Sequence, residues 1–171
     1  MSDNPVYLFF KYTLVLLFQF FVLSNVQFFG YITPYYYPLL LLLMPVKFNQ
    51  HTLLILGFFT GLIVDMMERS GAIHASATVM MVYLRPVFLR LVSTRGGEDL
   101  PNLSVSTLGF RNFSLLVILA FFFHHFTMYF IDALKLQQLD VILWRTAQTT
   151  LLSFVVVLVF HGLTFPKKVN P

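Results

Sequence analysis

The chain has 171 residues, of which 58% are hydrophobic and 11% are charged, and its mean hydropathy is +0.79. A soluble domain carries about 25% charged residues, so this composition indicates a membrane protein and leaves no length for a soluble domain beside the membrane part. The net charge of +4 does not indicate a nucleic-acid partner, because the basic residues flank apolar runs, and the absence of cysteine excludes disulfides, thiolate metal sites and thiol catalysis.

Six apolar segments follow one another along the chain, at about 6–27, 32–46, 51–67, 72–92, 113–131 and 144–164. A helix needs about 20 mostly apolar residues to cross the hydrocarbon core. We therefore predict an all-α polytopic membrane protein with six transmembrane helices in a single domain over 1–171. The first segment is too long for the core of a signal peptide and lacks a cleavage site, so it is predicted to be a retained anchor.

The second segment is unusual because it is short and contains Pro34, Pro38 and Pro45. As a helix rising about 1.5 Å per residue it barely reaches about 22 Å. It is therefore either sheltered by neighbouring helices or re-entrant, and its tyrosines at 35–37 suit the headgroup level. A polar loop over 93–112 separates the fourth and fifth segments and is expected to be the most mobile part of the chain.

The distribution of Lys and Arg predicts the orientation. With both termini in the cytoplasm, eight of the eleven basic residues lie on the inner side and three on the outer side. Arg85 and Arg90, near the inner end of the fourth segment, are interpreted as snorkelling anchors. The inner residues are Lys11, Lys47, Arg85, Arg90, Arg95, Arg111, Lys167 and Lys168, and the outer ones are Arg69, Lys135 and Arg145.

The stretch over 57–77 has the most informative pattern. Gly57, Gly61 and Asp65 recur every four residues and so share one face of a helix. Two glycines at this spacing let another helix approach closely in a membrane. A polar turn over 68–71 and a second helix rich in small residues follow. The pattern predicts a helical hairpin against which the other segments pack.

Asp65 and His74 flank the turn, and each has two interpretations. Asp65 is either a buried acceptor that faces neighbouring helices or an interfacial carboxylate paired with Arg69, one turn further on. An aspartate at the centre of a membrane helix costs roughly 2.5–3.5 kcal/mol on insertion scales, and less near the helix end where Asp65 is predicted to lie. His74 either donates to Asp65 or, as the preferred interpretation, bonds a backbone carbonyl or water at the interface.

His124 and His125 lie inside the fifth segment, and His125, Tyr129 and Asp132 recur at helical spacing. A metal usually needs three or four convergent ligands, and no further residue fits this spacing. Neutral histidines that hydrogen-bond across helices are therefore preferred over a proton relay or a metal site. Other polar residues in or beside the spans are expected either to join helices or to line a pocket: Gln19, Asn25, Gln27, Gln148, Thr149 and Ser153.

Catalytic motifs such as HExxH, G-x-S-x-G and the P-loop are missing from the sequence. An enzyme also needs a nucleophile or an acid–base pair within hydrogen-bond reach, and no spacing in the chain supplies one. We therefore expect a protein that acts by binding, without turnover, metal or cofactor.

Several of these features together resemble the rod shape-determining MreD family. They are the six short spans, the Pro-rich second span, a G-x-x-x-G-L-x-x-D core with a Gly-containing turn, and the span that ends at 83–84. The core residues are Gly57, Gly61, Leu62 and Asp65, followed by His74-Ala75. The resemblance is sharpest over 30–90 and weaker over 113–165. The turn departs from the family's usual Pro-Leu-Gly, since it reads Ser70-Gly71-Ala72-Ile73.

The resemblance implies a component of the bacterial inner membrane that belongs to the cell-wall elongation machinery. It implies a bitopic MreC-like partner and, through it, MreB filaments, a RodA-type glycosyltransferase and a class B penicillin-binding transpeptidase. It also implies a six-helix fold similar to the substrate-binding subunits of energy-coupling-factor transporters. We expect the partner to dock by helix packing on the face of Gly57, Gly61, Asp65 and His74.

Two functions therefore remain open. The first is a non-catalytic scaffold for wall elongation, and the second is a small-molecule (vitamin-type) substrate-binding subunit of a transporter. A polar, ligand-sized cavity that opens to the outside would favour the second.

Overall fold

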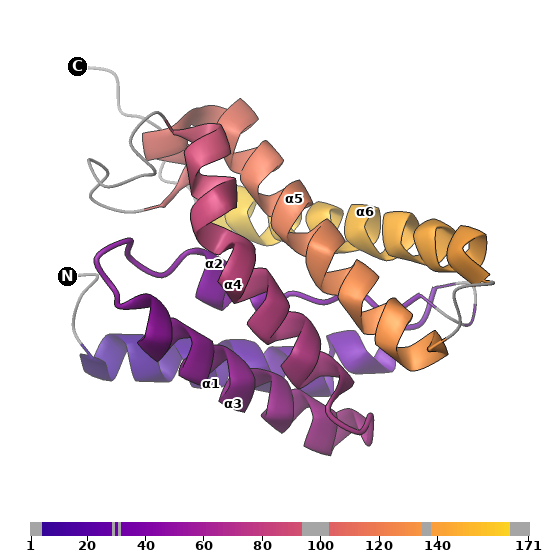
Figure 1. Ribbon diagram of the computed structural model, residues 1–171. Coiled ribbons are helices and arrows are strands. Elements are labelled where there is room, and N and C mark those ends of the chain that lie inside the picture. Colours follow the sequence, from indigo (N-terminus) through magenta and orange to yellow (C-terminus); the bar gives the residue numbers. More distant parts are fainter. Residues whose placement is uncertain (1–4, 29, 31, 94–102, 135–137, 165–171) are drawn as a thin grey trace.

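The computed structural model describes residues 5–28, 30, 32–93, 103–134 and 138–164. Its elements are α1 (Pro5–Phe21), the short 3-10 helix η1 (Leu23–Asn25), α2 (Pro38–Leu42), α3 (Gln50–Glu68), α4 (Ile73–Val92), α5 (Val105–Ala133) and α6 (Leu139–Thr164), as Figure 1 shows. Among the described residues, the one β-type pairing joins Phe28 and Ile32 across a tight turn. The fold is therefore all-helical.

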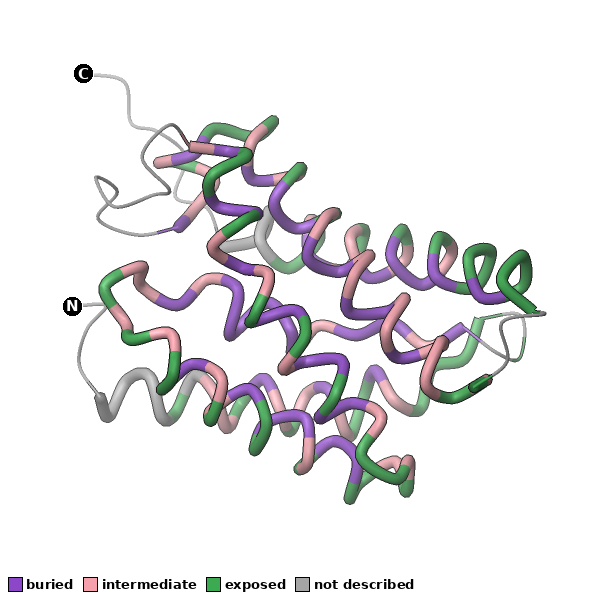
Figure 2. The backbone as a smooth tube through the Cα atoms, viewed as in Figure 1, coloured by how far each residue is buried: buried purple, intermediate pink, exposed green. Residues whose placement is uncertain are grey.

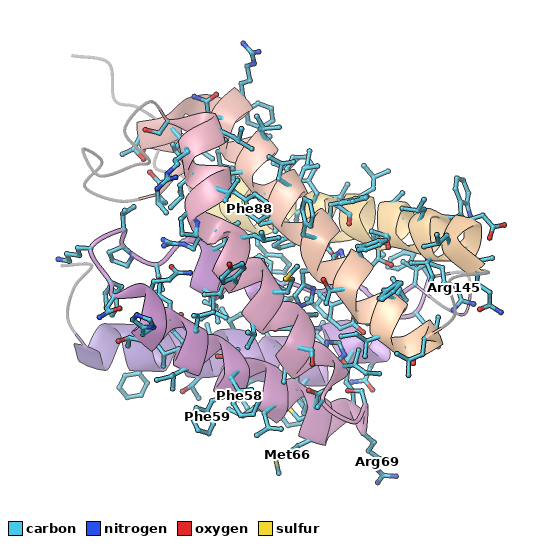
Figure 3. The ribbon with its side chains drawn as sticks, viewed as in Figure 1. Phe58, Phe59, Met66, Arg69, Phe88 and Arg145 are labelled. Carbon is cyan, nitrogen blue, oxygen red and sulfur yellow. The ribbon has the colours of Figure 1, made fainter. Side chains whose placement is uncertain are left out.

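Four helices are long and apolar enough to cross a membrane: α3, α4, α5 and α6 over 139–160. Their outward faces carry large apolar side chains such as Phe58, Phe59 and Met66, which point away from the bundle in Figure 3. Such faces are stable in contact with lipid, where apolar surface needs no cover. The chain is a membrane-embedded helical protein. Helix α1 is shorter than these four and lies beside them.

The helices run back and forth between the two ends of the bundle (Figure 1). One end holds the start of α1, the connection from α2 to α3, the end of α4, the start of α5 and the end of α6. The opposite end holds η1, the turn between α3 and α4, the end of α5 and the start of α6. Consecutive segments therefore point in alternating directions.

The prediction of a helix over 32–46 is wrong, because only Pro38–Leu42 is helical. Pro34 and Pro38 lack the N–H groups that a helix would need, and residues 32–37, here called the central segment, are non-helical. Such backbone advances further per residue than the 1.5 Å of a helix, so a short segment can return across the bundle. Tyr35 and Tyr37 are buried inside the bundle, at 6% and 0% exposure. The segment is sheltered by its neighbours.

Side chains of α1 and α6 satisfy the backbone of the central segment. Non-helical backbone inside a membrane protein needs such partners because lipid offers none. Tyr36 N–H donates to Oε1 of Gln19 at 2.8 Å, and Nε2 of Gln19 donates to the carbonyl of Pro34 at 3.2 Å. Tyr35 N–H donates to Oγ of Ser153 at 2.9 Å. Gln19 and Ser153, which the sequence placed inside spans, therefore hold the central segment in place.

The buried faces of α2, α3, α4, α5 and α6 meet in one hydrophobic core, and Figure 2 shows how the buried positions follow the inward side of each helix. This core includes Leu41, Leu53, Met81, Phe113 and Val157, each fully buried. Helices α4 and α5 pack along much of their length. The core therefore joins the hairpin predicted around 57–77 to the second half of the chain.

Several predicted boundaries differ from the structure. Helix α5 begins at Val105 rather than at 113, with Ser104 and Thr107 forming a capping box and Gly109 making a kink at φ +76°. Glycine adopts this φ without strain, so the chain can kink here between two helical parts. The first turn of α5 lies in a polar stretch, and for this reason the sequence predicted a loop there. Helix α1 ends at Phe21 rather than 27, and α6 begins at Leu139 rather than 144. Residues 94–102 of the predicted mobile loop lie outside the described residues.

Arg85 is not the snorkelling anchor that the sequence predicted, because it is only 2% exposed. Its Nε donates to the carbonyl of Leu42 at 3.0 Å, and its Nη2 donates to the carbonyl of Met44. These carbonyls lie at the last residue of α2 and just after it, where a helix leaves acceptors unsatisfied and favours a positive charge. Arg90 is exposed, as expected of an anchor.

Candidate functional site

Helices α3 and α4 form a hairpin that depends on a glycine. A Cβ atom added at Gly61 would lie 2.5 Å from Cα of Ala75 and 2.6 Å from the carbonyl oxygen of His74. Only glycine lets the two backbones approach so closely. A Cβ added at Gly57 would meet Cγ2 of Val82 at 3.2 Å, which is a side-chain contact. Helix α4 lies against the small-residue face, so the close approach that the two glycines allow is made within the chain.

Asp65 closes the hairpin by capping α4. Its Oδ1 accepts from the N–H of His74 at 2.9 Å and from Oγ of Ser70 at 2.6 Å, and its Oδ2 accepts from the N–H of Ala75 at 2.8 Å. These N–H groups belong to the first turn of α4, where no helical partner exists and a negative charge is favoured. Asp65 is therefore the buried acceptor, and the paired alternative fails because Arg69 is exposed and points away (Figure 3).

The turn between the two helices has three residues with positive φ: Arg69 at 58°, Gly71 at 58° and Ala72 at 69°. Arg69 and Ala72 adopt a conformation that costs a side-chain residue about 1 kcal/mol or more. The capping bonds of Asp65 offset this cost. The turn therefore joins α3 to α4 through three residues in the left-handed conformation, Arg69, Gly71 and Ala72.

Glu68, at the end of α3, joins three further elements. Its Oε1 accepts from Oγ of Ser24 in η1 at 2.7 Å. Its Oε2 lies 3.1 Å from the hydroxyl of Tyr35 in the central segment and 3.1 Å from Nε2 of His74 in α4. The side chain of Glu68 is 19% exposed and that of His74 is 3% exposed. The side chain of His74 is therefore directed at Glu68, and only its backbone N–H is bonded to Asp65.

The network continues inward through Tyr37. The hydroxyl of Tyr37 lies 3.1 Å from Nδ1 of His74 and 2.8 Å from Nε2 of His124 in α5. Thr78 lies beside it, with Oγ1 3.4 Å from the Tyr37 hydroxyl, and donates to the carbonyl of His74 at 2.6 Å. Tyr37 and His124 are fully buried. Glu68, His74, Tyr37 and His124 thus form one continuous row, here called the polar row.

His125 and Asp132 do not join the polar row. Nδ1 of His125 lies 3.0 Å from Oγ1 of Thr150 in α6, a hydrogen bond across helices as the sequence predicted. The hydroxyl of Tyr129 lies 2.8 Å from Oγ1 of Thr149. Asp132 is exposed at the end of α5. His125, Tyr129 and Asp132, which share a helical spacing, therefore do not meet in one site. The described residues contain no group of three acidic, histidine or cysteine side chains that could hold a metal.

Sequence reasoning missed Glu68 and the two tyrosines as members of a site. Glu68 lies three residues after Asp65, so that both fall on the same side of α3, and this spacing is the signal that could have identified it. No comparable signal exists for Tyr35 and Tyr37, because their positions depend on the non-helical path of the central segment. The sequence did single out His74, His124 and Asp65, which the structure brings to the same side of the bundle interior.

An open groove of about 720 Å³ runs along the outer side of α4 and α5. Its polar lining consists of hydroxyls, and those of Ser76 and Thr127 donate to carbonyls of their own helices at 2.8 Å. The groove is therefore an apolar surface, unlike the polar cavity of a small-molecule subunit. Its lining residues are Leu54, Ser76, Val79, Met80, Tyr83, Phe123, Phe126, Thr127, Phe130 and Ile131.

Comparisons of the chain with family models, curated proteins and solved structures give no significant match.

Proposed function

We propose that this chain is a non-catalytic scaffold of the MreD type in the inner membrane of a bacterium, with both termini in the cytoplasm. In this proposal it binds a bitopic MreC-like protein and through it contributes to cell shape and peptidoglycan synthesis. MreB filaments, a RodA-type glycosyltransferase and a class B transpeptidase are the indirect partners. The proposal rests on the residue pattern over 30–90 and on one structural observation, which is the apolar groove of α4 and α5.

The shape of the groove suits a single membrane helix. On α4, Ser76, Val79, Met80 and Tyr83 follow the spacing of one helical stripe, and α5 supplies the opposite wall. A helix that lies between two others makes close contacts along its length, and such contacts drive association where lipid is the solvent. The smaller side chains of Ser76 and Val79 leave space at one end of this stripe. The membrane span of the MreC-like partner is the proposed occupant.

The distribution of polar groups favours the scaffold over a vitamin-binding subunit. A small-molecule site is concave and places a few polar groups where they fix the ligand. In this protein the polar groups of Asp65, Glu68, Gln19 and Tyr37 bond to other side chains of the bundle or to backbone. The groove offers apolar side chains instead. These carboxylates, this amide and this hydroxyl are therefore already engaged within the bundle.

Photo-crosslinking tests the groove directly. A photoreactive amino acid at Met80, which is 40% exposed in the groove, should crosslink to the span of a co-expressed MreC-like protein. The matched control is Leu151, which is 66% exposed on α6. We expect an adduct from position 80 and none from position 151.

Equal adducts at both positions, or adducts at 151 alone, would contradict the groove as the docking site. If the purified protein instead bound a vitamin saturably at nanomolar concentration, the scaffold proposal would be wrong and the transporter alternative would take its place.

A further inference from the structure

The polar row carries ionisable groups from the end of α3 to the centre of an apolar bundle. Oε2 of Glu68 lies 3.1 Å from Nε2 of His74, Nδ1 of His74 lies 3.1 Å from the Tyr37 hydroxyl, and this hydroxyl lies 2.8 Å from Nε2 of His124. At the inner end, Nδ1 of His124 is buried and has no hydrogen-bond partner among the described residues. Ionisable groups inside membrane proteins are costly and commonly serve in function.

The row has one complete arrangement of protons when Glu68 is ionised. Nε2–H of His74 donates to Glu68, the Tyr37 hydroxyl donates to Nδ1 of His74, and Nε2–H of His124 donates to the Tyr37 oxygen. Each imidazole is then neutral, with one N–H and one acceptor nitrogen. Nδ1 of His124 is left as an unprotonated nitrogen. This arrangement places one negative charge in the row, on Glu68.

A second complete arrangement contains one more proton. Glu68 is a carboxylic acid that donates to Nε2 of His74, Nδ1–H of His74 donates to the Tyr37 oxygen, and the Tyr37 hydroxyl donates to Nε2 of His124. His124 then has its hydrogen on Nδ1. The same three contacts are kept with every donor and acceptor exchanged, and the row is neutral. The removal of a charge favours this form in a low-dielectric interior.

We infer that the polar row is a binding site for one proton, which it relays between Nδ1 of His124 and the carboxylate of Glu68. A proton that binds Nδ1 of His124 displaces the Nε2 proton to Tyr37. Tyr37 passes its own proton to Nδ1 of His74, and His74 passes its Nε2 proton to Glu68. Each of the three groups gains one proton and loses one, so the only net change is the neutralisation of Glu68. The inference is independent of the proposed scaffold function.

The surroundings of the row make the relay specific to these four residues. The other partners of Glu68 are the hydroxyls of Ser24 and Tyr35, which donate in both arrangements. Oγ1 of Thr78 lies 3.4 Å from the Tyr37 hydroxyl and 3.5 Å from Nε2 of His124. Its one proton is donated to the carbonyl of His74, so Thr78 can accept from the row but does not pass a proton along it. Asp65 is engaged with backbone N–H groups of α4. From α6 the neighbours are hydroxyls of Thr149 and Thr150. Four titratable groups face the row: Asp65 of α3, Tyr35 of the central segment, and His125 and Tyr129 of α5. The nearby arginines, Arg69 and Arg145, are exposed.

The test is nuclear magnetic resonance of the full chain in lipid nanodiscs, with ¹⁵N-labelled histidine, from about pH 4 to pH 9, which brackets the ordinary titration of Glu and His. The chain has five histidines, so the ring signals can be assigned from single His→Asn variants. As the pH is lowered, we expect the ring proton of His124 to move from Nε2 to Nδ1. The ring proton of His74 should move in the same way at the same pH. The infrared band of a protonated carboxyl should appear at that pH and be lost in Glu68→Gln.

Two hydroxyl deletions provide the matched comparison. Tyr37→Phe removes the middle of the row, so that His124 should no longer change its protonated nitrogen when Glu68 titrates. Tyr36→Phe removes a neighbouring hydroxyl outside the row and should leave the two events coincident. The inference is wrong if His74 becomes doubly protonated while His124 keeps its nitrogen, if the wild-type row shows no transition in this range, or if Tyr37→Phe leaves the coupling intact.

Discussion

Four buried polar side chains in this bundle bond backbone groups that have no partner within a helix. Asp65 accepts from two N–H groups of α4, Gln19 and Ser153 bond the central segment, and Arg85 donates to two carbonyls at the end of α2. A backbone group without a partner inside a membrane protein costs several kcal/mol. Each of these side chains therefore makes an irregular piece of backbone possible.

Substitution of Asp65 should show how much capping matters. Asp65→Leu leaves the N–H groups of His74 and Ala75 without acceptors, at about 1–3 kcal/mol for each buried donor. Asp65→Asn keeps one oxygen acceptor and places an amide NH₂ near the other donor, so its loss of stability should be smaller. Thermal unfolding of the purified protein in detergent, followed by circular dichroism, measures both.

Melting temperatures of both Asp65 variants equal to that of the wild type would show that the carboxylate does not cap α4.

Arg85 provides a second test, because its planar guanidinium reaches two carbonyls at once. Arg85→Lys keeps the charge but replaces the fork with a single ammonium group, which cannot reproduce both bonds. We expect a loss of about 1–3 kcal/mol. Arg90→Lys is the control: this residue is exposed on the same helix, and its substitution should change stability by less than about 0.5 kcal/mol.

If both substitutions at Arg85 and Arg90 proved equally mild, the buried bonds of Arg85 would contribute nothing to stability.

At the scale of elements, the hairpin of α3 and α4 depends on two glycines that are not equivalent. At Gly61 an added Cβ would meet backbone atoms of α4, which cannot rotate away, whereas at Gly57 it would meet the end of a valine side chain. The same substitution made at these two positions, one helical turn apart, therefore compares a contact with rigid backbone with a contact with a side chain that can move.

Gly61→Ala should destabilise the protein, and Gly57→Ala should be nearly neutral. Alanine is favoured over glycine by about 1 kcal/mol in a helix, and this gain is common to both sites. At Gly61 it is outweighed by overpacking, which costs typically about 1–3 kcal/mol or more. Gly61→Leu should be worse than Gly61→Ala. Unfolding temperatures in one detergent give the order directly, and the reverse order would show that the helices do not meet at Gly61.

The sequence predicted those elements that are determined by their own periodicity. The hairpin, its small-residue face and the cores of α3 to α6 follow from local pattern. The central segment does not, because its prolines argue against a helix without defining the path that replaces it. Its path depends on Gln19 and Ser153, which are distant in the chain. For the same reason Tyr35 and Tyr37 could not be assigned to a site.

For the whole molecule, the alternating direction of the segments places chain positions at two opposite ends (Figure 1). The division of basic residues, eight against three, predicts that the end holding the starts of α1, α3 and α5 faces the cytoplasm. Reporter fusions after residues 50, 104 and 171 should therefore report the cytoplasm, and fusions after 30, 70 and 138 the outside. An outside signal at 104 would overturn this topology.

The dependence of the central segment on α6 has a consequence for biosynthesis. Ser153 follows Tyr35 by 118 residues, and at roughly 5–20 residues per second a ribosome needs about 6–24 seconds to reach it. Until then the N–H of Tyr35 lacks its acceptor, so we expect the segment to stay hydrated and to settle last. Thr33→Cys introduces a single cysteine into a chain that otherwise has none. This cysteine should react with a water-soluble maleimide in chains that end at residue 138 and become protected in the full chain. Equal protection in both would show that the segment settles without α6.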